Sequence, residues 1–168
     1  MILEQNIGTE TVTYINHYLK GGQIMSIPQV EFDAKAIRLE RIFDNTEKMG
    51  YVNDGLVCEK VNNVYGKLMF GEVPEDRPIT YASYVMSVDG KIAFEDNEVG
   101  PMIAKTNHLD KDGATADFWV LNLLRANCDG IIIGSGTMIK EPDYSGSAYD
   151  PDLLQARIDN GKSVAHGQ

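Results

Sequence analysis

The feature that most constrains the fold of this chain is an apolar helix pattern followed at once by a short apolar run. In "ATADFWVLNLLRAN", residues 114–127, apolar side chains recur with the helical period and cover a broad arc, and Asp112 or Thr115 is placed to cap the helix. "CDGIIIG", residues 128–134, has the continuous apolar pattern of a strand buried on both faces of a parallel sheet. An arc that wide requires burial, so we expect this helix to pack against a sheet.

A second strand pattern precedes this helix. Residues 79–86, "ITYASYVM", alternate as a strand does. Strand, long connection with a helix, then buried strand is the pattern of a right-handed βαβ unit, so the predicted fold class is α/β. Pro74 and Pro78 bracket charged residues and indicate a linker. We therefore divide the chain into an N-terminal α/β extension, 1–76, and a second unit, 77–168.

Three further helices are predicted from periodicity and end signals. Residues 9–20 place apolar residues at helical spacing before Gly21-Gly22, and residues 33–44 carry an imperfect apolar stripe after Asp33. "DPDLLQARIDNG", residues 150–161, has Asp150 as a possible N-cap, proline at the first helical position and Gly161 just past the end. The last helix thus has both its start and its stop signal in the sequence.

Composition and charge restrict the class of protein. The chain has 168 residues, 43% of them hydrophobic, which fits one globular domain. A formal charge of −10 argues against nucleic acid and anionic membrane surfaces as partners. No apolar stretch approaches the roughly 20 residues of a membrane span, and no secretory signal pattern is present. With only two cysteines, Cys58 and Cys128, and no CxxC pairing, we expect a cytoplasmic protein without disulfides. The three histidines have no metal-ligand spacing, so no metal is expected.

Gly134-Ser135-Gly136-Thr137 follows the buried run and is the first candidate site. Glycines there allow close backbone approach, and N–H and hydroxyl groups can hold a phosphate. Neither nucleotide-binding motif is complete, because Ile139 stands where the dinucleotide fingerprint needs glycine and no P-loop lysine follows. A tight turn without a ligand explains the same residues.

Asp89-Gly90-Lys91, at the end of the first strand pattern, is the second candidate. Asp-Gly is a strong turn signal, and the lysine could meet a phosphate or a substrate hydroxyl, or be a solvated surface charge. Arg125 is expected to extend its charge to solvent or to counter the helix dipole. The loop Glu141-Pro142-Asp143-Tyr144 could supply an acid, a hydrogen-bond partner for ribose or only a turn.

In order along the chain, "RPITYASYVMSVDGKIA" and "LLRANCDGIIIGSGTMIKEPDYS" together resemble the reductase domain of riboflavin biosynthesis, over residues 77 to about 145. The resemblance implies a dihydrofolate-reductase-like fold, a parallel-type sheet flanked by helices. It implies NADPH-dependent reduction of the ribosyl group of 5-amino-6-(5-phosphoribosylamino)uracil to ribityl. The protein would supply binding and orientation and NADPH the hydride.

The resemblance also assigns roles by position. It makes Lys91 and Asp89 the catalytic residues, with Lys91 and Tyr144 contacting the substrate. The cofactor-binding positions that it implies are Val85, Gly134, Ser135, Gly136, Thr137 and Glu141. Both motifs follow strands, and strand ends are where α/β sheets bind ligands, so we expect them to face one crevice.

A departure from the family pattern leaves alternatives open. The family domain continues with a Gly-Gly loop for the cofactor phosphates, which residues 78–168 lack, so we expect this chain to be a fragment of a longer enzyme. An uncovered sheet edge favours a homodimer. A non-catalytic nucleotide-binding or interaction module, and a reductase of the same fold with another substrate, remain the alternative functions.

Overall fold

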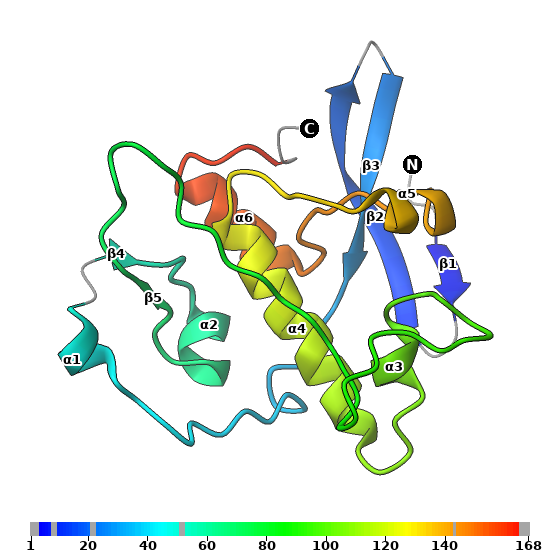
Figure 1. The fold of residues 1–168 in the computed structure, drawn as a ribbon. Helices are drawn as coiled ribbons and strands as arrows, with labels where there is room; N and C mark the ends of the chain where they lie inside the picture. The colour runs from blue at the N-terminus through cyan, green and yellow to red at the C-terminus, as the bar shows by residue number, and fades with distance from the viewer. Residues whose placement is uncertain (1–3, 8–9, 21–22, 51–52, 143, 165–168) are drawn as a thin grey trace.

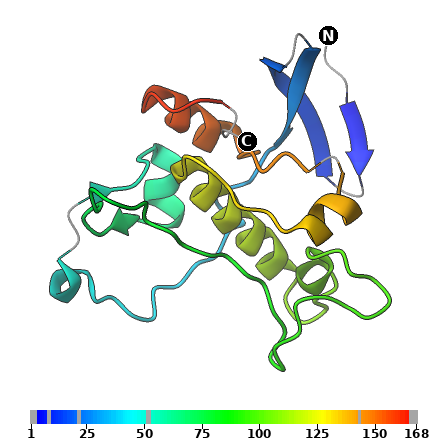
Figure 2. The ribbon, with the colours of Figure 1, turned by 45° about the horizontal axis from the view of Figure 1, so that its top comes forward.

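The computed structural model describes residues 4–7, 10–20, 23–50, 53–142 and 144–164. Their elements are, in chain order, β1 (Glu4–Ile7), β2 (Glu10–Lys20), β3 (Gln23–Val30), α1 (Thr46–Met49), β4 (Asn53–Asp54), α2 (Glu59–Val64), β5 (Met69–Phe70), α3 (Met102–Lys105), α4 (Lys111–Asn127), α5 (Ser135–Lys140) and α6 (Pro151–Asp159). Figure 1 shows α4 crossing the middle of the molecule. The β1–β3 sheet extends away from it to one side, as Figure 2 also shows.

The central helix, α4, confirms the helix predicted at 114–127. It begins at Lys111, and its cap is Asp110, whose carboxylate accepts a hydrogen bond from the Gly113 N–H at 3.0 Å. The prediction of Asp112 or Thr115 as the cap was wrong, because Asp110 has the extended backbone that an N-cap requires. Trp119, which is fully buried, lies at the centre of the core. The wide apolar arc is therefore buried as the sequence indicates.

The hydrophobic core gathers around α4 from both ends of the chain. Its buried members are Val30, Phe32, Ile37, Leu56, Val61, Ala116, Trp119, Leu123, Ala126, Ala148 and Leu153. Residues from both sides of the predicted boundary at 76/77 contribute to this cluster. The division into two units stays a prediction.

The last helix, α6, confirms its sequence signals. Asp150 caps it by accepting hydrogen bonds from the N–H groups of Asp152 (2.9 Å) and Leu153 (3.2 Å), with Pro151 at the first turn. Gly161, just past the end, has φ of +73°, a conformation that favours glycine. Local signals thus determine both ends of α6.

Arg157 ties α6 to the end of α4. Its side chain is 1% exposed. It donates hydrogen bonds to the carbonyl oxygens of Ala126 (2.9 Å) and Cys128 (2.6 Å). The last carbonyls of a helix lack helical partners and carry partial negative charge, so a buried guanidinium there satisfies and stabilises them.

The N-terminal segment forms an antiparallel sheet. The helix predicted for 9–20 was wrong, because Glu10–Lys20 is strand β2, paired with β1 on one side and β3 on the other. Residues 11–15, Thr-Val-Thr-Tyr-Ile, are β-branched or aromatic and favour strands. Helical spacing of three apolar residues could not reveal a partner strand further along the chain.

The helix predicted for 33–44 was also wrong. Those residues contain one turn, in which the Ala36 N–H donates to the Asp33 carbonyl oxygen at 3.0 Å, and no regular structure follows. Ile42 and Phe43, taken as part of its apolar stripe, are 91% and 78% exposed. The turn at Asp33 is a side-chain turn, because its carboxylate accepts the Lys35 N–H at 2.9 Å.

The parallel sheet stays a prediction. Residues 79–86 and 128–134, the segments expected as its strands, lie outside every strand assigned among the described residues, although Gly130 forms an isolated bridge. Both run from the C-terminal end of α4 toward α3 and α5 (Figures 1 and 2). No helix among the described ranges has the length and apolar character that a membrane span requires.

A first prediction concerns Asp150, whose side chain is fully buried. Asp150→Ala removes a carboxylate that accepts hydrogen bonds from Trp119 and Lys60 besides capping α6. Leaving such donors buried without an acceptor should lower the free energy of unfolding by about 3 kcal/mol or more, measured by urea denaturation. The matched control is Asp152→Ala: its carboxylate also pairs with Lys60, at 2.7 Å, but is 57% exposed. The control should cost less than about 1 kcal/mol; equal losses would contradict the assignment.

A second prediction concerns the pH dependence of stability. Burial raises the pKa of the half-buried Asp117 carboxyl. The folded state therefore binds this proton more tightly than the unfolded chain, and ionisation lowers stability as pH rises through the folded pKa. Asp117→Asn should raise the free energy of unfolding at pH 7 by up to about 1 kcal/mol, allowing for solvent screening. The gain should vanish below about pH 4. Asp96→Asn, at an exposed position, is the control, and a gain that does not change with pH would refute the explanation.

Candidate functional site

A pocket of about 1100 Å³, the candidate pocket, lies between two segments that were predicted as strands. Residues 78–84 line one side and residues 128–134 line another. Leu121, Arg125 and Asn127 of α4 lie between these segments in the chain and also face the space. Helical periodicity places Leu121 and Arg125, four residues apart, on one face of α4, and Cys128 follows as the C-cap of the helix.

The glycines of the second motif have open space beside them. A Cβ added at Gly134 or at Gly136 would meet nothing within 4 Å, and neither residue has a positive φ. Neither packing nor backbone conformation therefore requires glycine here. A ligand that approaches the backbone closely would account for both.

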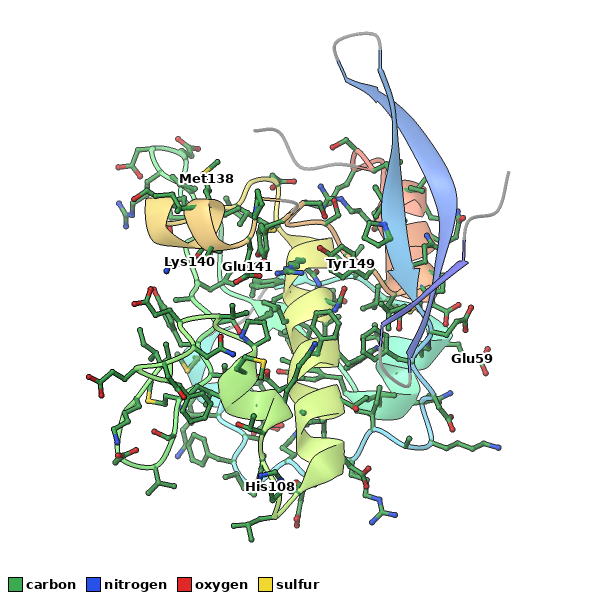
Figure 3. The ribbon with its side chains drawn as sticks, turned by 90° about the vertical axis from the view of Figure 1, so that its right-hand side faces the viewer. Glu59, His108, Met138, Lys140, Glu141 and Tyr149 are labelled. Carbon is green, nitrogen blue, oxygen red and sulfur yellow. The ribbon has the colours of Figure 1, made fainter. Side chains whose placement is uncertain are left out.

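Gly134, Thr137 and Tyr144 are the predicted site residues that line the candidate pocket. Ser135 and Gly136 follow Gly134 in the first turn of α5. Glu141 ends that helix, and its N–H donates to the Thr137 carbonyl oxygen at 2.7 Å. Figure 3 shows Met138, Lys140 and Glu141 at this helix. Three separate residues of the second motif and the following loop, Gly134, Thr137 and Tyr144, therefore contribute to the pocket wall.

Arg125 is buried, not extended to solvent as the sequence analysis expected. Its side chain is 6% exposed and lies 5.0 Å from the ring centre of Tyr144 and 5.5 Å from that of Tyr149. It also donates a hydrogen bond to the Tyr144 hydroxyl at 2.5 Å. Two aromatic faces replace part of the water around the cation, which explains how α4 tolerates an arginine on its buried side.

Tyr81 and Cys128 occupy neighbouring parts of the pocket wall. The Tyr81 hydroxyl donates to the Leu124 carbonyl oxygen at 2.8 Å, and the Cys128 thiol to that of Arg125 at 3.2 Å. Burial, and then the neighbouring Cys128, raise the pKa of Tyr81 well above its ordinary value. Burial likewise raises the pKa of the Cys128 thiol. Both groups remain protonated at neutral pH, so neither is an activated nucleophile or base.

The first motif is a turn, as predicted from Asp-Gly. The Gly90 N–H donates to the Ser87 carbonyl oxygen at 2.8 Å, and Gly90 has φ of +83°. Lys91 pairs with Asp89 at 3.0 Å, and the two side chains are 69% and 60% exposed. The hydrogen bond from Ser87, and then that from Lys91, lower the pKa of Asp89, so its carboxyl is ionised at neutral pH.

The structure does not bring this turn into the candidate pocket. Asp89, Lys91 and the half-buried Val85 are absent from the residues that line it. The pocket is lined by Gly134 and Thr137 of the second motif and by residues 78–84, which precede the first motif. The shared crevice expected for the two motifs stays a prediction. The catalytic roles of Asp89 and Lys91 and the cofactor role of Val85 stay predictions.

Sequence reasoning missed Tyr81, Arg125 and Cys128 as pocket residues. For Arg125 the available signal was the helical spacing that aligns it with Leu121 on α4. The alternation of 79–86 could not have singled out Tyr81, because the segment forms no strand and every residue of 78–84 lines the pocket. The stacking of Tyr144 and Tyr149 on Arg125 joins segments about 20 residues apart and had no local signal.

A second cavity of about 410 Å³ lies between α2 and α6. Lys60 and Asp152, which pair with each other, contribute to its lining. The Lys60–Asp152 pair joins the two helices, and none of the motif residues lines this cavity. The candidate pocket is therefore the better site.

Comparisons with known proteins add no assignment: no family model, no curated protein and no solved structure matches the chain. Within the described ranges, no three His, Cys, Asp or Glu side chains are grouped so as to hold a metal ion.

A third prediction separates glycines that a ligand needs from those that packing needs. Gly134→Ala and Gly136→Ala should change the free energy of unfolding by less than about 1 kcal/mol, because their Cβ atoms meet open space. Gly55→Ala is the contrast: its Cβ would lie 2.8 Å from Asn127 Oδ1 and 3.2 Å from Leu68. That crowding should cost about 1–3 kcal/mol in urea denaturation. A large loss at Gly134 would show that packing fixes this residue after all.

Proposed function

We propose that this chain belongs to an NADPH-dependent reductase of the riboflavin-biosynthesis type. Its reaction would reduce the ribosyl group of 5-amino-6-(5-phosphoribosylamino)uracil to ribityl, and its cofactor would bind along Gly134–Thr137. The observation that carries the proposal is that segments 78–84 and 128–134, far apart in the chain, line one pocket of about 1100 Å³. Those segments hold parts of both motifs of the family resemblance.

The residues along the second motif suit a phosphorylated cofactor. Gly134 and Gly136 leave room for close approach, and the hydroxyl of Thr137 lies at the pocket wall. The volume of the pocket is at the upper end of the usual range for small-molecule sites, which suits a large ligand. The apolar part of the wall, including Leu121 and residues 131–133, would exclude water from bound rings.

When bound, NADPH would supply the hydride. The role of this chain would be to hold the sugar and to stabilise negative charge on the oxygen that accepts a proton. Lys91 is the cation proposed for that task, since an ammonium favours developing negative charge. Asp89, ionised and paired with it, would hold the ammonium in place.

A fourth prediction tests binding and turnover separately. Titration of NADPH, followed by its own fluorescence, should give saturable binding that Gly134→Ala and Gly136→Ala weaken about tenfold or more. With the phosphoribosylaminouracil as substrate, Lys91→Ala should lower kcat/KM about 100-fold while leaving NADPH affinity unchanged. Lys67→Ala is the matched control, because Lys67 is also exposed and paired with an aspartate, Asp54, at 2.7 Å.

The alternative function is a nucleotide-binding module without catalysis. The observation that favours it is the exposure of Lys91 and its position outside the pocket. NADPH binding without turnover of this substrate or of related phosphoribosyl compounds would select it. Turnover of a related compound alone would indicate a reductase of different specificity, and absence of NADPH binding would refute both cofactor-based functions.

A further inference from the structure

The Tyr144 hydroxyl oxygen accepts a hydrogen bond from Arg125, whose guanidinium is always positively charged. Arg125 donates to it at 2.5 Å from a side chain that is 6% exposed. A guanidinium has only donors, so it cannot take the hydroxyl proton. Among the described residues no other group accepts that proton, although Tyr144 is half-buried and lines the candidate pocket.

The orientation of this hydroxyl is fixed by more than one contact. The Arg125 guanidinium lies 5.0 Å from the Tyr144 ring centre as well as donating to its oxygen. The backbone of Tyr144 is held by its N–H, which donates to the Glu141 carbonyl oxygen at 3.0 Å. A donor held in this way needs an acceptor from the pocket, either water or a ligand.

Tyr149 provides an internal comparison. Its ring also stacks on Arg125, at 5.5 Å, but its hydroxyl lies 3.1 Å from the Ser145 hydroxyl and is partnered within the protein. It does not line the candidate pocket. Figure 3 shows Tyr149 beside α4, where its backbone N–H donates to Asn122. Of these two tyrosines, Tyr144 is therefore the one that lines the candidate pocket and whose hydroxyl donates to no described residue.

We infer that Tyr144 is a specificity-determining hydrogen-bond donor and that Arg125 is its positioning residue. The pocket would select ligands that place an acceptor oxygen, a base carbonyl or a phosphate oxygen, at the Tyr144 hydroxyl. This inference rests on the proposed function for the class of ligand, a phosphorylated pyrimidine nucleoside. It adds that an acceptor oxygen of the ligand is recognised by the Tyr144 hydroxyl, which Arg125 holds in position.

The test compares three probes, uridine 5′-monophosphate, cytidine 5′-monophosphate and uridine, by calorimetric titration of the wild-type chain and of Tyr144→Phe. The phenylalanine keeps the ring over Arg125 and removes only the donor. Loss of one hydrogen bond should weaken binding about tenfold. If uridine and its monophosphate lose affinity and the cytidine nucleotide does not, the donor contacts the C4 carbonyl of uracil, which cytosine lacks. If all three probes lose affinity, it contacts the C2 carbonyl, which both bases carry. If both nucleotides lose affinity and uridine does not, it reads a phosphate oxygen.

Tyr149→Phe is the matched control and should leave all three affinities within about twofold. Arg125→Met should reproduce the selective loss of Tyr144→Phe, and Arg125→Lys, which restores a charged donor, should recover part of it; thermal melting confirms that each variant is folded. The inference is overturned if no probe binds the wild type, or if no probe loses more than twofold in Tyr144→Phe. NADPH titration of the same samples distinguishes the two proposals. If NADPH binds but Tyr144→Phe changes no probe affinity, the role of Tyr144 is refuted and the proposed function is not.

Discussion

The buried carboxylate of Asp150 joins the three helices on which the candidate pocket depends. One of its oxygens accepts hydrogen bonds from the Trp119 indole (3.1 Å) in α4 and from Lys60 (2.9 Å) in α2. The other caps α6. Burial alone would lower the pKa of Lys60, but its bonds to Asp152 and Asp150 raise that pKa overall, so the Lys60 ammonium is charged at neutral pH. The buried carboxylate of Asp150 is tolerated because each lone pair of its two oxygens accepts a hydrogen bond.

The hydrogen bonds of Asp150 determine where the pocket wall lies. With α6 fixed by Asp150, Arg157 reaches the end of α4 and binds the carbonyl oxygens of Ala126 and Cys128. The chain must then leave α4 in one direction, and residues 128–134 leave along the pocket. The apolar core supplies most of the free energy, while these directional bonds determine the geometry of the wall.

The parts of the fold that the sequence predicted are those whose signals are local. The cap and stop of α6 lie within the segment itself, and α4 has an apolar arc wide enough to be decisive. The helix predicted for residues 9–20 was wrong because three apolar residues at helical spacing also suit a strand. The partners of that strand, β1 and β3, lie in other segments. At the site, the turn at Gly90 and the open glycines followed from residue type. The burial of Arg125 did not, because the rings that cover it come from the loop at 144–149.

The residues proposed to bind the cofactor and the residue proposed for catalysis are held in place by different interactions. Gly134, Thr137 and Tyr144 border the pocket and are held by α5 and by Arg125, both connected to the core helix α4. The turn at 87–91 is held by bonds within itself, Ser87 N–H to the Lys91 carbonyl oxygen at 2.9 Å and Gly90 N–H to that of Ser87. Among the described residues, 79–86 makes no backbone hydrogen bond to another segment. The position of Lys91 relative to the pocket therefore depends on side-chain packing of 79–86, including the Tyr81 contact to Leu124. Under the proposed function, the cofactor-binding residues would be held by α5 and Arg125, whereas the placement of Lys91 would depend on how residues 79–86 pack.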